Sequence, residues 1–124
     1  MILIDSCIWL EYLGDTDRAD IFEAALEGPE PILVPSICIY EVFRKLLPVI
    51  GKIQALTCVA AMARHRIVDL DSHLAMDAAM VASEYRLPMA DAVIYSTARL
   101  FTAELWTEDT HFQGLSGVKL YPKP

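Results

Sequence analysis

Short apolar runs alternate with helical patterns along the whole 124-residue sequence, and this alternation constrains the fold more than any other feature. Runs typical of buried strands occur at 1–4, 31–34, 67–70 and 104–107, with a further edge strand expected at 118–121. Apolar side chains recur at helical spacing over about 6–13, 21–26, 36–47, 52–63, 72–85 and 91–101. This order predicts a three-layer α/β/α fold with a central, mostly parallel sheet of four to five strands.

The helix boundaries follow from local signals. Ser36 and Ser72 are expected to cap the N-termini of their helices, because a serine hydroxyl accepts a hydrogen bond from a free backbone N–H. Pro48 is expected to disturb the helix that begins at Ser36.

The length favours one compact domain over residues 1–124, because two ordinary domains would each lack a sufficient core. Hydrophobic residues make up 55% of the chain, above the roughly 45–50% of soluble domains. The excess indicates a well-filled core together with apolar surface kept for a partner.

We expect a cytoplasmic protein without a membrane partner. No run approaches the roughly 18 uncharged apolar residues of a membrane span, and no basic segment precedes the first apolar run. The three cysteines Cys7, Cys38 and Cys58 lie in separate apolar stretches, which favours buried free thiols and a reducing compartment.

The net charge of −7 argues against broad electrostatic capture of nucleic acid. Acidic residues that gather around a bound cation would change this locally, because the metal reverses the sign of the field where a phosphate must sit.

Four acidic residues fall at or near strand ends. Asp5 directly follows the first strand, Asp109 lies two residues past the fourth, Glu41 is on the helix after the second, and Asp91 opens the last helix. In open α/β sheets, ligands bind outside the carboxyl ends of the strands, where the strand order reverses. The four carboxylates are therefore expected to share one edge.

Each acid also has a structural interpretation. Asp5 and Asp91 fit helix N-termini, Asp109 fits an Asx turn, and Glu41 fits an ion pair with Arg44 or Lys45. Four carboxylates close together would repel unless a cation held them, and Mg²⁺ or Mn²⁺ prefers such oxygen ligands. Zinc is not expected, because no set rich in His and Cys accompanies the acids.

Four motifs in the same order resemble those of PIN domains. They are Asp5-Ser6 after the first strand, Glu41 in Val34-Pro35-Ser36-x4-Glu41, the segment Leu87–Ala92, and the segment Thr107–Phe112. The resemblance covers essentially the whole chain. Small members of this family are mostly VapC-type toxins of bacterial and archaeal toxin–antitoxin pairs.

The resemblance implies a Mg²⁺-dependent endoribonuclease that hydrolyses RNA, forms a homodimer and is silenced by a cognate protein antitoxin. It implies that Asp5, Asp91 and Asp109 bind the metal, and that Glu41 is a further ligand or the base for the attacking water. Ser6 and Thr107 would supply supporting hydroxyls. Candidates for phosphate contact are Arg44, Lys45, Arg86 and Arg99.

Two other functions share features with this one. A phospho-signalling receiver domain also binds Mg²⁺ at strand ends, but it needs an acidic pair where Asp5 is followed by Ser6 and Cys7. A catalytically inactive PIN-fold module that binds RNA or protein would have no reason to keep mutually repelling carboxylates. His111 is expected to be a histidine on the surface of a turn.

Overall fold

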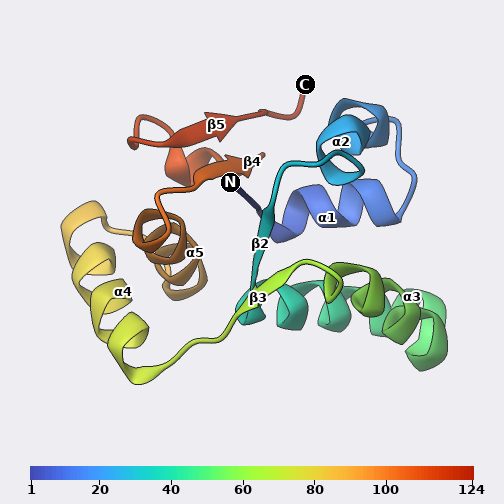
Figure 1. Ribbon diagram of the computed structural model, residues 1–124, viewed down its shortest axis with the longest axis horizontal. Coiled ribbons are helices and arrows are strands. Elements are labelled where there is room, and N and C mark those ends of the chain that lie inside the picture. Colours follow the sequence, from blue (N-terminus) through green and yellow to red (C-terminus); the bar gives the residue numbers. More distant parts are fainter.

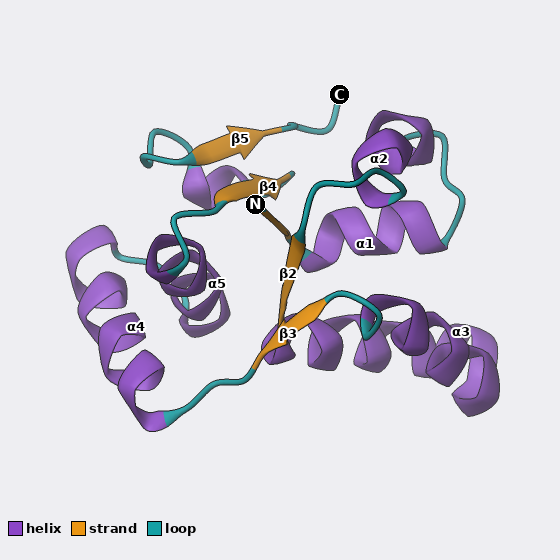
Figure 2. Cartoon of the chain, viewed as in Figure 1, coloured by secondary structure: helices purple, strands orange, loops and turns teal.

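The computed structural model describes residues 1–124 and places five strands in one central sheet (Figures 1 and 2). The strands are β1 (Ile2–Ile4), β2 (Ile32–Pro35), β3 (Arg66–Val68), β4 (Glu104–Thr107) and β5 (Val118–Leu120). Their order is β3-β2-β1-β4-β5, and every neighbouring pair is parallel. This arrangement confirms the predicted fold class. The strand order differs from the 2-1-3-4-5 order of receiver domains, so the chain is not a receiver domain.

Helices cover both faces of the sheet. They are α1 (Ser6–Leu13), α2 (Ala19–Leu26), α3 (Ser36–Met62), α4 (Ser72–Tyr85) and α5 (Met89–Leu100), with a 3-10 turn η1 (Thr110–Phe112) after β4. Figure 1 shows α1, α2 and α3 on one side of the sheet and α4 and α5 on the other, which gives the three layers.

The core lies around the central strands. β1 and β2 are buried along their whole length, as expected for parallel strands covered on both faces. Trp9 of α1 and Ile94 of α5 pack into the same apolar cluster from opposite layers. Because the core fixes where β1 and β4 end, it also fixes the residues that follow them.

The longest helix departs from the expected pattern. α3 continues through Pro48, and its backbone leaves the helical region at Gly51, where φ is 81°. A glycine adopts this conformation without the steric cost that a side chain would impose, so the break falls there. By length and composition α3 is the one helix long and apolar enough to cross a membrane, and 11% of its most apolar window is buried; a single helix of this kind is weak evidence of a span. Its first turns carry Cys38 and Val42 into the core.

Two predicted helix caps are wrong by one residue. Asp71, rather than Ser72, caps α4, because its extended backbone lets the side chain accept a hydrogen bond from the Leu74 N–H at 2.8 Å. Ser36 is the first residue of α3, and its hydroxyl accepts a hydrogen bond from the Leu70 N–H at 3.3 Å. Ser36 thus ties the loop before α4 to the start of α3.

Candidate active site

The predicted acids meet at the carboxyl ends of β1 and β4. After β1 the chain builds β2 and β3 on one side, and it later returns to place β4 and β5 on the other. The gap between β1 and β4 is therefore the point where the strand order reverses. A cavity of about 280 Å³ lies there. Its lining residues are Asp5, Ser6, Cys7, Glu41, Asp91, Glu108, Asp109 and Lys123.

Asp5 is the most deeply buried of the four predicted acids, at 4% exposure. One carboxylate oxygen accepts a hydrogen bond from the Ser6 N–H at 2.7 Å, so Asp5 caps α1 as the structural interpretation required. The other oxygen accepts a hydrogen bond from the Thr107 hydroxyl, also at 2.7 Å. Burial raises the pKa of Asp5, and the nearby charge of Asp109 adds to this effect.

Glu41 turns toward Asp5 rather than toward a neighbouring base. The Ser6 hydroxyl donates to Glu41 Oε1 at 3.0 Å, and this bond replaces the ion pair with Arg44 or Lys45 that the structural alternative required. Partial burial raises the pKa of Glu41, and the charges of Asp5 and Asp91 act in the same direction.

Asp91 and Asp109 are joined by His111. Asp91 lies in the first turn of α5, and Asp109 forms the expected Asx turn by accepting the His111 N–H at 2.9 Å. His111 Nδ1 lies 2.9 Å from Asp91 Oδ2 and 3.2 Å from Asp109 Oδ1. His111 lies exposed in the turn after β4, as expected, and its ring also contacts both carboxylates.

The donor set fits a hard divalent cation. Burial is the largest cause of the raised pKa of both Asp5 and Asp91, with neighbouring acids adding to it. A cation would relieve this repulsion. Two groups of side chains bring their ligand atoms within 4.8 Å of one another: Asp5, Cys38 and Glu41, and Asp91, Asp109 and His111.

The presence of Cys38 and His111 in these groups was not expected from the sequence. Burial raises the pKa of the Cys38 thiol well above its ordinary value. A neutral thiol is a poor metal ligand, since the thiolate is the form that binds. The oxygen ligands of the four acids therefore remain the principal donors.

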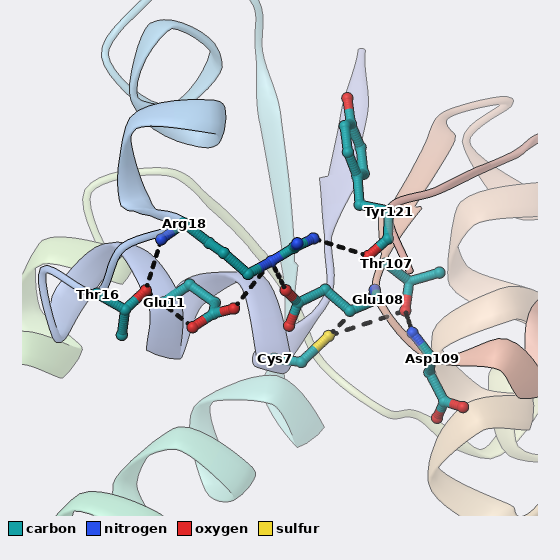
Figure 3. A network of polar contacts seen from close by, with 8 residues as sticks. All are labelled: Cys7, Glu11, Thr16, Arg18, Thr107, Glu108, Asp109 and Tyr121. Atoms are coloured by element: carbon teal, nitrogen blue, oxygen red, sulfur yellow. Dashed lines mark hydrogen bonds and ion pairs between the residues drawn. The ribbon is translucent and has the colours of Figure 1, made fainter. Parts of the chain in front are cut away.

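Thr107 couples the loops that follow β1 and β4. Its hydroxyl donates to Asp5 and accepts the Asp109 N–H at 3.0 Å. Cys7 Sγ accepts the Glu108 N–H at 3.4 Å and lies 3.8 Å from Thr107 Oγ1 (Figure 3). Burial raises the pKa of Cys7 to about 12, so this thiol stays neutral and lines the cavity as a hydrogen-bonding group.

Arg18 does not line the cavity itself but holds Glu108, which does (Figure 3). Arg18 Nε donates to Glu108 Oε2 at 2.6 Å and lies 3.2 Å from Glu11 Oε2, while its terminal nitrogen donates to the Tyr121 carbonyl oxygen at 2.9 Å. Burial raises the pKa of Glu108, and the adjacent Glu11 adds to this effect. Neither Arg18 nor Glu108 was singled out from the sequence.

The basic residues proposed for phosphate contact do not line the cavity. Arg44, Lys45, Arg86 and Arg99 are absent from its walls, and Arg99 instead lies 5.7 Å from the centre of the Tyr95 ring. Lys123 is the one basic residue among the lining side chains. No motif marks it, because its position depends on how the segment after β5 folds back.

Comparisons with known proteins agree with this geometry. The family model of the PIN domain matches residues 2–118. The chain therefore belongs to the PIN domain family. No curated protein sequence matches it.

The chain is also similar to solved structures of toxin–antitoxin proteins. A chain of the toxin-antitoxin complex from Klebsiella pneumoniae is 25% identical, with a TM-score of 0.85 and coverage of 99% of this chain and 100% of that one. The Sarcin-Ricin loop cleaving toxin VapC20 from Mycobacterium tuberculosis is 17% identical, with a TM-score of 0.78 and coverage of 98% and 100%. A chain of VapBC2 from Rickettsia felis, bound to a DNA fragment from its promoter, is 18% identical, with a TM-score of 0.74 and coverage of 98% of both.

Proposed function

We propose that residues 1–124 form a single nuclease domain that hydrolyses RNA with Mg²⁺ or Mn²⁺, and that this domain is the toxin of a toxin–antitoxin pair. The observation that carries the proposal is the convergence of four carboxylates from four separate segments on one cavity at the β1–β4 switch point. Membership of the PIN family and similarity to toxin–antitoxin structures support it.

We assign Asp5, Asp91 and Asp109 as metal-binding residues and Glu41 as a further ligand or the base for the attacking water. The bound ion would activate water and stabilise the charge that develops on the phosphorus. Ser6 and Thr107 hold Asp5 and Glu41 in place, since each of their hydroxyls donates to one of these carboxylates. Burial of Asp5 keeps bulk water from competing for its oxygens.

The partner in this proposal is a protein antitoxin that covers α3. Val49 and Ile53, exposed at 76% and 81%, lie on this helix, and Glu41 on the same helix lines the cavity. A single amphipathic segment can therefore cover the apolar side chains and direct a basic side chain into the acidic site. The overall charge of −7 favours such a basic partner.

A homodimer in the cytoplasm completes the proposal. Met76 and Met80 of α4 and Met89 of α5 are 62–73% exposed, and Met89 also lines a groove whose lining residues are all apolar. Apolar surface of this kind is typical of an interface between subunits.

The test is cleavage of a mixed RNA pool by the purified chain in Mg²⁺ and in Mn²⁺. We expect cleavage that EDTA abolishes and that the double variant Asp5→Asn, Asp91→Asn lacks. Glu104→Gln is a matched control, because Glu104 is an exposed acid of β4 outside the cavity. Cleavage that persists in the double variant would refute the assigned site.

The alternative is a PIN-fold module that binds RNA or protein without cleaving. It would be supported by retained RNA binding with no cleavage in any divalent metal. The raised pKa values of Asp5, Glu41 and Asp91 weigh against it, because a purely binding role does not require this buried repulsion.

A further inference from the structure

The walls of the acidic cavity pose an electrostatic problem for an anionic substrate. Five carboxylates line it: Asp5, Glu41, Asp91, Glu108 and Asp109. A phosphodiester chain carries a negative charge at every nucleotide, so it meets repulsion at every part of this rim that a metal ion does not neutralise.

Among the side chains that line the cavity, one is a cation that can offset this repulsion. Arg18 is occupied by Glu108, Glu11 and the Tyr121 carbonyl. Lys123 lines the cavity yet takes part in none of the ion pairs of the structure. The hydrogen bond with Glu108 is the largest cause of the lowered pKa of Glu11, and the charge of Lys123 acts in the same direction.

The segment that carries Lys123 is held in place. The Tyr121 N–H donates to the Thr107 carbonyl oxygen at 2.8 Å, and the Tyr121 carbonyl accepts from Arg18 (Figure 3). The Tyr121 ring packs edge-on against Phe22, with ring centres 5.1 Å apart, and lies 5.4 Å from Trp106.

The two residues beside Lys123 stiffen its backbone. Pro122 and Pro124 have a fixed φ, and each proline also restricts the residue before it to extended conformations. The backbone of Lys123 is therefore restricted and is anchored at Tyr121, two residues away. This restriction lowers the backbone conformational entropy lost when Lys123 binds an anion.

We propose that Lys123 is the residue of this chain that binds RNA phosphate at the acidic cavity, next to the cleavage site. The inference rests on the proposed nuclease function and names the side chain that recognises its substrate. Lysine suits this role because its ammonium group is a compact positive charge that attracts phosphate, whereas the carboxylates of the cavity repel it. Lys123 does not take part in bond breaking, so its loss affects binding of the substrate before it affects turnover.

The experiment measures both binding and cleavage in the full chain. Binding of a fluorescent single-stranded RNA is followed by anisotropy with Ca²⁺ in place of Mg²⁺, at KCl concentrations from 50 to 300 mM. Cleavage kinetics use an oligonucleotide chosen from those that the unmodified chain cuts. The variants are Lys123→Ala, Lys123→Arg and Lys123→Glu. Lys52→Ala is the control, because Lys52 is exposed on α3 away from the cavity.

We expect Lys123→Ala to weaken binding and raise KM about 5-fold, the size of one exposed charge contact, with kcat within about 2-fold of the parent. The salt dependence of binding should fall by about 0.7 in the slope of log K against log salt, the loss of one phosphate contact on a single strand. Lys123→Arg should restore most of the binding, Lys123→Glu should weaken it further, and Lys52→Ala should change neither quantity.

Failure of this inference and failure of the nuclease proposal give different results. If the unmodified chain cuts RNA and Lys123→Ala leaves KM and the salt slope unchanged, the role of Lys123 is refuted and the nuclease stands. If the chain cuts no RNA but binds it in a manner that depends on Lys123, the nuclease fails and the phosphate contact stands. Absence of any RNA binding by the unmodified chain overturns both. Thermal unfolding of Lys123→Ala should match the parent, since this exposed side chain makes no ion pair.

Discussion

Replacing Arg18 with alanine tests the wall of the cavity through its effect on stability. The side chain of Glu108 is 3% exposed and that of Arg18 is 19% exposed, and their 2.6 Å contact is the shortest in this group. Without Arg18, the buried Glu108 carboxyl must either stay charged without a partner or take up a proton. Protonating a carboxyl of ordinary pKa 4.5 at pH 7 costs about 3.4 kcal/mol, which bounds the electrostatic part of the loss.

We therefore expect Arg18→Ala to lower the free energy of unfolding by about 3 kcal/mol, near the lower end for a broken buried pair. For a chain of 124 residues this corresponds to a fall in Tm of about 11 °C. The second variant Arg18→Ala, Glu108→Gln removes the unpaired charge and should recover about 2 kcal/mol. The remainder reflects the lost hydrogen bond to Tyr121.

The assay is urea unfolding in EDTA at pH 7.0 and at pH 4.5, followed by circular dichroism. Loss of Arg18 raises the folded-state pKa of Glu108 further above its unfolded value, so the variant loses stability as pH rises above 4.5. The deficit relative to the parent should therefore be largest at pH 7.0 and shrink at pH 4.5. A deficit below about 1 kcal/mol at pH 7.0, or no recovery in the double variant, would refute this account of the network.

Three further predictions concern the metal site and the surface. Magnesium at about 100 times its Kd should stabilise the parent by about 2.7 kcal/mol in thermal unfolding at pH 7.5 and leave Asp5→Asn unchanged; an equal shift in both would contradict the assigned ligand. The folded-state pKa values of Asp5, Glu41 and Asp91 are raised, so their contribution to stability in EDTA is present below pH about 4 and is lost as pH rises. Calorimetry should therefore show a Tm that declines toward pH 7. A Tm that rises instead would be inconsistent with repulsion among these carboxylates. Met80→Glu on α4 should raise the dissociation constant of the proposed homodimer at least about 100-fold by light scattering, since it buries a charge in an apolar interface, and an unchanged dimer would place the interface elsewhere.

The sequence predicts the fold well where burial governs the pattern. β1 and β2 are continuous apolar runs because both faces of each strand are covered, and the turn residues that bound them give their ends. Once these ends are known, Asp5 and Asp109 must lie at the same edge of the sheet. The prediction that the four acids share one edge of the sheet follows from this reasoning, and the structure brings all four to one cavity there.

The parts of the site that escaped prediction depend on contacts between distant segments. Arg18 pairs with Glu108 across 90 residues, and the polar sequence around each shows only a solvated helix end and a turn. Lys123 reaches the cavity because Tyr121 is pinned by Thr107 and Arg18, and no local pattern encodes that anchoring. Pro48 signals a disturbance, but whether the backbone breaks there or three residues later depends on where a glycine relieves the strain.

The split of the acids between the two halves of the sheet has a consequence for synthesis. Asp5 and Glu41 are made early, whereas Asp109 follows Asp5 by 104 residues. The ribosome therefore releases the first ligands long before the last, and β4 must be inserted beside β1 before the set is complete. Under the proposed function, a growing chain cannot cleave the messenger RNA that encodes it. Nuclease activity requires that β4 has paired with β1 and brought Asp109 to the site.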